Sequence, residues 1–194
     1  MTYLTESEVR ARASRITQRV QKTAGRVLSE SVASADQKVD VFLSHSSAEP
    51  EEILLGIKSL LEDLGLSVYV DKYSDSHLSP DTVTKATAQV LRGRMRSSNT
   101  LLYIYSQHSK QSRWMPWELG FFDGLKGAVG VIPVTRNQEH TFKGEEYLNL
   151  YPDVDVAKMQ GDERPYLWIN ESANTYARLD LWVKGSAKIQ TRQA

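Results

Sequence analysis

The stretch Leu101-Leu-Tyr-Ile-Tyr105, followed after a polar segment by Trp114-Met-Pro-Trp-Glu118, decides the fold of this 194-residue chain. The first run is continuously apolar, as expected of a parallel strand that is covered on both faces. The polar residues 106–113 predict a loop at the carboxyl edge of the sheet, where open parallel sheets place their ligand sites. Pro116 is typical of a first helical position, because its missing N–H would have no partner there. Glu118 is therefore expected in the first turn of a helix beside the ligand edge.

The segments around this stretch alternate between strand-like and helix-like patterns, which is typical of βαβ units and a parallel sheet. Strands are predicted at 39–43, 66–70, 101–105 and 130–134, and helices at 51–64, 81–95 and 116–126. Gly65 fits a helix C-cap, and Ser79-Pro80-Asp81 is typical of a helix start. These elements predict an α/β core over residues 38–135.

Residues 1–36 contain no strand-like run and predict a helical extension with one narrow apolar stripe. The stripe consists of Val9, Ala13, Ile16, Val20, Ala24 and Val27. Such a stripe needs a partner, which is either the core of the same chain or another helix in self-association or partner binding.

The remaining part, residues 136–194, is rich in aromatic side chains and is expected to pack on the core as an α/β extension. Pro165-Tyr-Leu-Trp-Ile169 predicts a short strand. Residues 172–184 predict a terminal helix with Tyr176 and Trp182 on one face.

Composition excludes several classes of protein. The formal net charge is zero, so no overall field would attract nucleic acid or an acidic membrane. No apolar stretch approaches the ~20 residues of a membrane span, and the N-terminus carries charges where a secretory signal would be apolar. A soluble, cytoplasmic protein is expected. Cysteine is absent and the four histidines lack the spacing of metal ligands, so neither disulfides nor a structural metal is predicted.

Four motifs in order resemble the TIR family, the Toll/interleukin-1 receptor domain, in its bacterial form. They are Val39-Asp-Val-Phe-Leu-Ser-His-Ser-Ser47, Gly65-Leu-Ser-Val-Tyr-Val-Asp71, the strand 98–106 with Ser112-Arg-Trp-Met-Pro-Trp-Glu-Leu119, and Val131-Ile-Pro-Val134. The resemblance implies a three-layer, flavodoxin-like α/β fold with a mainly parallel central sheet. Two positions depart from the family pattern: Met115 replaces a frequent Cys, and the loop His45-Ser46-Ser47 lacks a frequent Arg.

The resemblance implies two different functions, because some TIR domains consume NAD while others only assemble into signalling platforms. In the catalytic members, the Glu that matches Glu118 acts on the nicotinamide ribose. A carboxylate there would stabilise or trap the oxocarbenium-like centre that forms when the N-glycosidic bond breaks. A scaffold would not need this Glu, which favours catalysis. The plainer interpretation is that a first-turn Glu is a favourable partner of the helix dipole.

Other candidate binding residues follow from the same resemblance. Ser44, His45 and Ser46 would offer donors to phosphate or ribose, although turn chemistry alone explains serine in a loop. Asp71 would accept ribose hydroxyls or cap its loop. Trp114 would cover the ribose or nicotinamide by stacking, or serve only in packing.

A lone bacterial TIR domain of this size resembles the signal-producing protein of Thoeris-type anti-phage defence. The implied product is an ADP-ribose-derived messenger that activates a separate effector protein, and self-association through TIR surfaces is implied as well. Two alternatives remain: a non-catalytic adaptor that acts by homotypic assembly, and an enzyme similar to nucleoside deoxyribosyltransferases. NAD would be the substrate, and no metal is expected.

Overall fold

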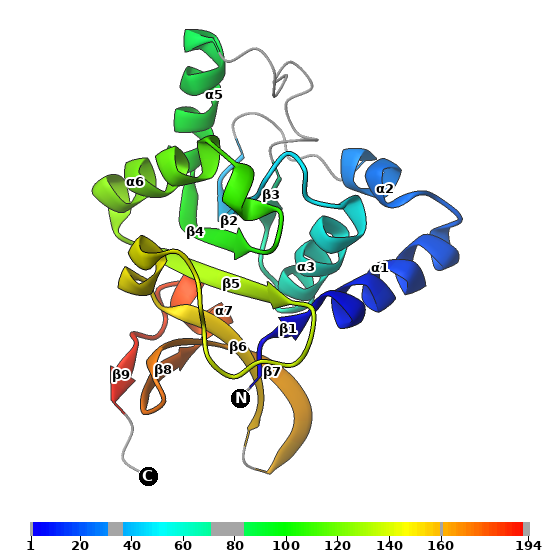
Figure 1. Ribbon diagram of the computed structural model, residues 1–194, viewed down its shortest axis with the longest axis vertical. Helices are drawn as coiled ribbons and strands as arrows, with labels where there is room; N and C mark the ends of the chain where they lie inside the picture. Colours follow the sequence, from blue (N-terminus) through cyan, green and yellow to red (C-terminus); the bar gives the residue numbers. More distant parts are fainter. Residues whose placement is uncertain (1, 31–36, 71–83, 160, 192–194) are drawn as a thin grey trace.

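The computed structural model describes residues 2–30, 37–70, 84–159 and 161–191. In this part of the chain, nine strands form one sheet in the order β3-β2-β4-β5-β6-β7-β8-β9, and β1 pairs with β5 (Figure 1). The strands are β1 (Leu4–Thr5), β2 (Val39–Ser44), β3 (Val68–Tyr69), β4 (Ser98–Tyr105), β5 (Val129–Thr135), β6 (Asp153–Met159), β7 (Asp162–Ser172), β8 (Thr175–Arg178) and β9 (Gln190–Thr191). The first five strands of this order are parallel, and each later neighbour is antiparallel. The expected α/β fold with a mainly parallel centre is confirmed.

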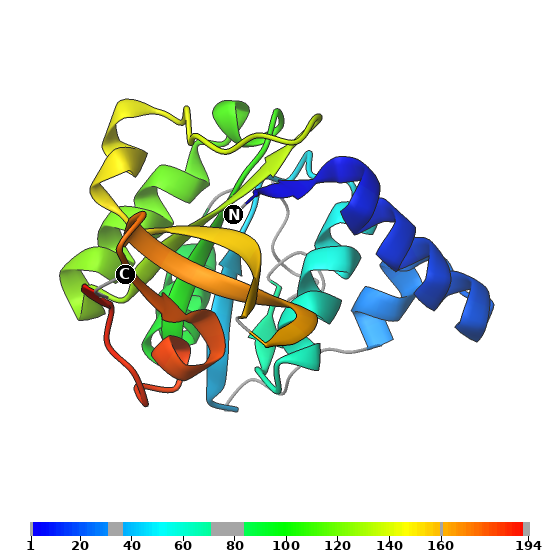
Figure 2. The ribbon, with the colours of Figure 1, turned by 90° about the horizontal axis from the view of Figure 1, so that it is seen from below.

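Helices cover the two faces of the parallel sheet (Figure 2). One face carries α3 (Glu51–Asp63) with α1 (Glu6–Val20) and α2 (Ala24–Glu30) outside it, and the other carries α5 (Lys85–Arg96) and α6 (Trp114–Lys126). Short 3-10 turns lie at Ser109–Gln111 and Glu146–Leu150, and α7 (Leu179–Val183) follows β8. The result is the three-layer arrangement that a parallel sheet requires, because both of its faces are apolar.

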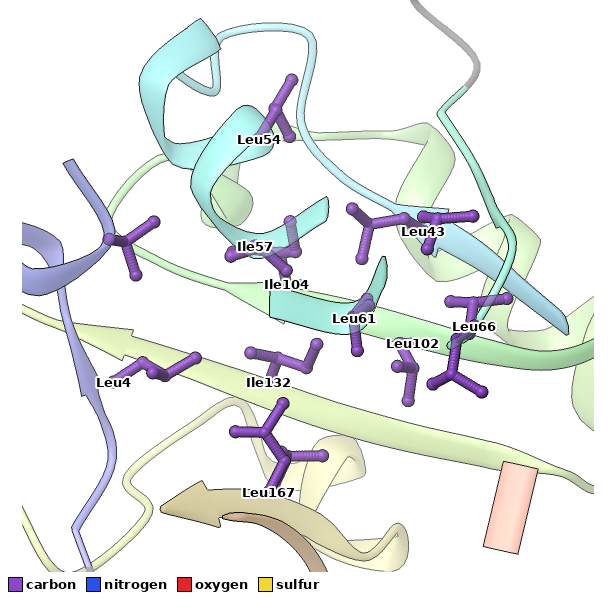
Figure 3. Close-up of a cluster of buried hydrophobic side chains, with 14 of the residues drawn as sticks. Leu4, Leu43, Leu54, Ile57, Leu61, Leu66, Leu102, Ile104, Ile132 and Leu167 are labelled. Carbon is purple, nitrogen blue, oxygen red and sulfur yellow. The ribbon is translucent and has the colours of Figure 1, made fainter. Parts of the chain in front are cut away.

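Each face of the sheet has its own hydrophobic core. Leu43, Leu102 and Ile132 alternate along β2, β4 and β5 with residues of the opposite face, and they pack against Ile57 and Leu61 of α3 (Figure 3). The second core lies between the sheet and helices α5 and α6. It contains Phe42, Tyr69, Tyr103, Met115 and Phe122. The side chains of β2 and β4 thus point alternately to the two helical layers, as the pleat demands.

The N-terminal extension is two helices where one was predicted. Gln21 adopts a left-handed conformation (φ 54°) that ends α1, and α2 begins at Ala24. Val9 and Ala13 of the apolar stripe are buried against α3, while Val20 is 44% exposed. Gly56 makes this approach possible, since a Cβ at this position of α3 would collide with the Val9 backbone carbonyl. The stripe therefore finds its partner largely within the same chain.

The prediction for the C-terminal end is wrong in one element. Residues 172–184 form the end of β7, a turn at Ala173 and Asn174, strand β8 and the short helix α7, not one helix. Tyr176 lies on β8 opposite Asn170 of β7. Hairpin pairing with β7 prevailed over the helical spacing of the apolar residues. Strand β6 was not predicted at all.

Smaller differences concern the ends of elements. Strand β3 contains only Val68 and Tyr69, and α6 begins at Trp114, two residues before the predicted start. Pro116 is therefore the third residue of α6, where its missing N–H still leaves no intrahelical bond unmade. Glu118 is the fifth residue, beyond the first turn. The predicted helix start at 79–81 lies outside the described residues, and Thr84 caps α5.

Candidate active site

The candidate site lies where the chain reverses its direction of travel across the sheet. From β2 the chain proceeds to β3 on one side, and then to β4 and β5 on the other. Such a switch point opens a crevice at the carboxyl ends of the two central strands, here β2 and β4, and this is where open α/β sheets bind ligands. The predicted loops after residues 43 and 105 both start at this edge.

A buried carboxylate and a hydroxyl meet at this switch point. The Ser44 hydroxyl, at the end of β2, donates a hydrogen bond of 2.6 Å to Oε2 of Glu118. Glu118 is only 2% exposed and Ser44 only 1%. The two residues come from separate motifs of the sequence, and α6 brings them together by packing on the face of β2 to which Ser44 points. A hydrogen bond to a carboxylate in such a dry place is stronger than one in water.

Two tyrosines extend the polar surroundings of Glu118. Burial raises the pKa of Tyr103 above its usual value, and the nearby Tyr147 and the charge of Glu118 act in the same direction. The hydroxyl of Tyr103 lies 3.5 Å from that of Tyr147. Tyr103 therefore remains a neutral hydroxyl beside the carboxylate. In the sequence, Tyr103 lies within an apolar strand, and nothing there indicated that its hydroxyl would lie near Glu118.

The loop after β2 is held by its own hydrogen bonds. His45 is 7% exposed, and its Nδ1 lies 2.9 Å from the Ser46 carbonyl oxygen. The Ser46 hydroxyl accepts a hydrogen bond from the Ala48 N–H at 3.2 Å, and the Glu49 N–H donates to the Ser46 carbonyl at 2.9 Å. Of the three residues predicted to bind the ligand in this loop, Ser44 contacts Glu118, and the Ser46 side chain stabilises the turn.

Trp114 begins α6 one helical turn before Glu118, so both side chains lie on the same side of the helix. Its ring packs edge-on against Trp117, with ring centroids 5.2 Å apart. Trp117 in turn stacks on Phe121, and Arg92 of α5 lies over both rings. Trp114 is half-buried and has a structural contact. Its predicted stacking on a ligand stays a prediction, and the predicted ligand-binding Asp71 lies outside the described residues.

Sequence reasoning missed a second carboxylate at this edge. Glu49 is 2% exposed and accepts a hydrogen bond of 2.6 Å from the hydroxyl of Ser106, the residue after β4. Burial raises the pKa of Glu49 above its usual range, and the hydrogen bond from Ser106 opposes that shift. Glu49 stands immediately before Pro50 and the acidic start of α3, so in the sequence it resembles one more acid at a helix N-terminus.

The chemistry available here is that of buried carboxylates at the carboxyl edge of the sheet. A carboxylate held by a hydroxyl can stabilise or trap a cationic carbon centre. In the described residues no three side chains of the types Asp, Glu, His or Cys gather as a metal site. The expectation that the enzyme needs no metal stays a prediction. No helix of the described part is long and apolar enough to cross a membrane.

Comparison with known proteins identifies the class to which this fold and site belong. The TIR domain family matches residues 41–164, and the chain belongs to this family. Its matched region extends beyond the motifs at 38–135 and includes β6 and the start of β7.

Two curated relatives refine the class. The chain is 42% identical over 146 residues to the protein called probable 3′ cyclic ADP-D-ribose synthase ThsB′ of Bacillus cereus (strain MSX-D12), and the match covers 75% of each chain. It is 34% identical over 83 residues to the putative cyclic ADP-D-ribose synthase TIR2 of Cytobacillus dafuensis, covering 42% of this chain and 22% of that one. Among solved structures, the TIR domain of the Toll-related receptor TRR-2 of Hydra magnipapillata is similar at 16% identity with a TM-score of 0.42, over 57% of this chain and 78% of that one.

Proposed function

We propose that this protein is an enzyme that cleaves NAD between nicotinamide and ribose and closes the ADP-ribose unit into a cyclic signalling molecule of anti-phage defence. The observation that carries the proposal is the buried hydrogen bond between Ser44 and Glu118 at the switch point of the sheet. The names of the two relatives, both described as cyclic ADP-D-ribose synthases, support this reaction over the hydrolysis of NAD alone.

The proposed role of Glu118 follows from the charge that the reaction creates. As the C–N bond breaks, positive charge develops on the ribose carbon and ring oxygen, and a carboxylate beside them lowers the barrier. Nicotinamide is cationic in NAD and leaves as a neutral base, so no strong acid is needed to expel it. Ser44 holds the carboxylate in place. Ring closure also requires that bulk water is kept from the activated ribose, and the low exposure of Glu118 supports such a role.

The remaining candidates receive roles in binding. Ser44, His45 and Ser46 belong to the loop that would hold phosphate or ribose, Asp71 would accept ribose hydroxyls, and Trp114 would stack on the ribose or nicotinamide. Self-association through TIR surfaces and a separate effector protein that responds to the product complete the proposal.

The test is a mass-resolved incubation of the purified protein with NAD, at high protein concentration and again with lysate of phage-infected cells. We expect loss of NAD, release of nicotinamide and a cyclic product. Glu118→Gln should reduce turnover about 1,000-fold without altering the fold, because it removes the charge and keeps the shape. Glu163→Gln, at a carboxylate 91% exposed on β7, is the matched control and should be fully active.

Other outcomes would point elsewhere. NAD left intact under both conditions, at all protein concentrations, would contradict the proposal and favour the adaptor alternative. Exchange of nucleobases on free nucleosides without NAD cleavage would favour the deoxyribosyltransferase-like alternative. Turnover retained by Glu118→Gln would show that another group performs the chemistry.

A further inference from the structure

The switch point contains two serine–glutamate pairs, and the proposed cleavage step uses only one. Ser44 ends β2 and donates to Glu118, while Ser106 follows β4 and donates to Glu49, each at 2.6 Å. Because β2 and β4 are parallel neighbours, the two pairs lie at the same edge of the sheet. Glu118 comes from α6 on one face, and Glu49 comes from the loop that leads into α3 on the other.

The two carboxylate oxygens of Glu49 have different surroundings. Its Oε2 is taken by Ser106, and its Oε1 is buried without a hydrogen-bond partner among the described residues. A buried carboxylate oxygen without a partner is costly, so its retention calls for an explanation. The charged groups that act on it are His45, His108 and Glu6. The two histidines favour the ionised form and Glu6 opposes it.

Ser106 connects this pair to open space. It lines a cavity of about 530 Å³, whose wall also includes Tyr105, Lys110, Arg136 and Phe142. A turn fixes Ser106 in this position, because its hydroxyl accepts a hydrogen bond from the His108 N–H at 3.0 Å while donating to Glu49. The carboxyl of Glu49 therefore lies one side chain away from a cavity that could admit part of a substrate.

We propose that Glu49 is the proton acceptor for the hydroxyl that closes the ring. The inference rests on the proposed function and adds to it the group that takes up the released proton. The attacking hydroxyl oxygen forms a bond with the ribose carbon, and the C–N bond to nicotinamide breaks. The electron pair of the broken bond stays on the nicotinamide nitrogen and neutralises its charge. The hydroxyl proton passes to the Ser106 oxygen, which lines the cavity, while the Ser106 proton passes along the existing hydrogen bond to Oε2 of Glu49. The proton leaves to water by the same route. Glu118 stabilises the cationic carbon, and Glu49 acts on the incoming oxygen through Ser106.

The experiment separates ring closure from bond cleavage. Wild type and Glu49→Gln are incubated with NAD over pH 5–9, and nicotinamide, cyclic product and linear ADP-ribose are measured separately. Glu49→Gln should retain nicotinamide release to within about tenfold and lose the cyclic product by at least about 100-fold in favour of the linear one. In the wild type, formation of the cyclic product should fall at acidic pH as Glu49 is protonated, and the variant should lack this dependence. Glu52→Gln, at the second residue of α3 and half exposed, is the matched control.

A second variant covers the case in which Glu49→Gln fails to fold. Ser106→Ala retains the carboxylate but removes the proton path and the hydrogen bond that favours its ionised form. The share of cyclic product should therefore fall, and the acidic limb of what remains should move to higher pH. An unmoved limb, or an unchanged share of cyclic product in Glu49→Gln, would overturn the role of Glu49 while NAD cleavage stands. A wild-type protein that only hydrolyses NAD would do the same. A wild-type protein that leaves NAD intact would overturn the proposed function itself, and this inference with it.

Discussion

Two regions of this molecule contain buried or partly buried carboxylates, and the consequences of this burial differ between them. At the switch point, Ser44 and Ser106 each hold one glutamate at the carboxyl edge of the sheet. On β6, Asp153 and Asp155 project from one side of the strand, where Tyr3 donates to Asp153 at 2.5 Å. We call this second group the β6 cluster. It consists of Tyr3, Asp153, Asp155 and Asn170.

The difference lies in what surrounds each region. The glutamates of the switch point lie next to the loops at the end of the central strands, where a ligand can approach. The β6 cluster lies within the sheet. There Val131 of β5 pairs with Asp153 of β6, and further along β5 the residues Leu4 and Thr5 of β1 pair with it. Tyr3 thus fastens the N-terminal segment to β6. Desolvation acts on both regions. Substitutions at the switch point should change catalytic activity, whereas substitutions in the β6 cluster should change only the stability of the fold.

The largest effect expected on this comparison comes from removing the hydroxyl at the switch point. Ser44→Ala deletes a charge-assisted hydrogen bond to Glu118, so that the carboxylate loses its position and polarity. A loss of about 100-fold in kcat/KM for NAD is expected, mostly in kcat. Steady-state kinetics of purified Ser44→Ala measures it. Activity within a factor of three of wild type would show that this hydrogen bond is structural, and the comparison of the two regions would fail.

The next effect is a gain in stability at the β6 cluster. Burial raises the pKa of Asp155 to about 6 from an ordinary 3.8, while Asn170 acts in the opposite direction. The folded state therefore binds this proton more tightly than the unfolded state. The penalty for ionising Asp155 is absent below about pH 4, grows as the pH rises to 6 and is complete above it. Asp155→Asn should accordingly raise the free energy of unfolding at pH 7 by about 2 kcal/mol, somewhat less than the whole pKa shift implies.

Thermal unfolding of wild type and Asp155→Asn between pH 4 and 8 provides the measurement. The difference between the two curves isolates Asp155 from Asp153 and Glu49, whose pKa values burial also raises. The difference should increase from pH 4 to 6 and then stay level, and NAD turnover should not change. A difference that decreases as the pH rises would mean that ionised Asp155 is stabilised in the folded protein.

The sequence predicted the centre of the fold because that part is governed by local pattern. The apolar runs of β2, β4 and β5 and the helical spacing between them leave little choice but a parallel sheet. The rule that parallel strands end at one edge placed Ser44 and the start of α6 on the same side of the sheet, but the packing of α6 on β2 and the hydrogen bond to Glu118 required the structure. The alternation Asp153-Val-Asp-Val156 was a sign of strand β6 that went unused.

The parts that sequence reasoning missed depend on contacts between distant segments. Strand β1 has only two residues, and it exists because β6 leaves the end of β5 open. The helix expected at 172–184 has suitable apolar spacing, but β7 offers hydrogen-bond partners to Thr175–Arg178 and prevails. Glu49 was hidden among the acids at the start of α3. Its burial and its bond to Ser106 are tertiary facts.

The smallest effect expected is that of Tyr3→Phe, the counterpart of Ser44→Ala in the β6 cluster. The substitution removes the hydroxyl that donates to Asp153 and retains the ring, which is 7% exposed. The hydrogen bond lowers the pKa of Asp153 against the dominant effect of burial, so its loss should raise that pKa further and destabilise the ionised folded state. A decrease of about 1 to 1.5 kcal/mol in the free energy of unfolding is expected at pH 7, measured by urea denaturation. NAD turnover should remain at the wild-type level under conditions where both proteins are folded. A loss of turnover like that of Ser44→Ala would mean that the attachment of the N-terminal segment controls the active edge, and the two regions would then have to be treated as one.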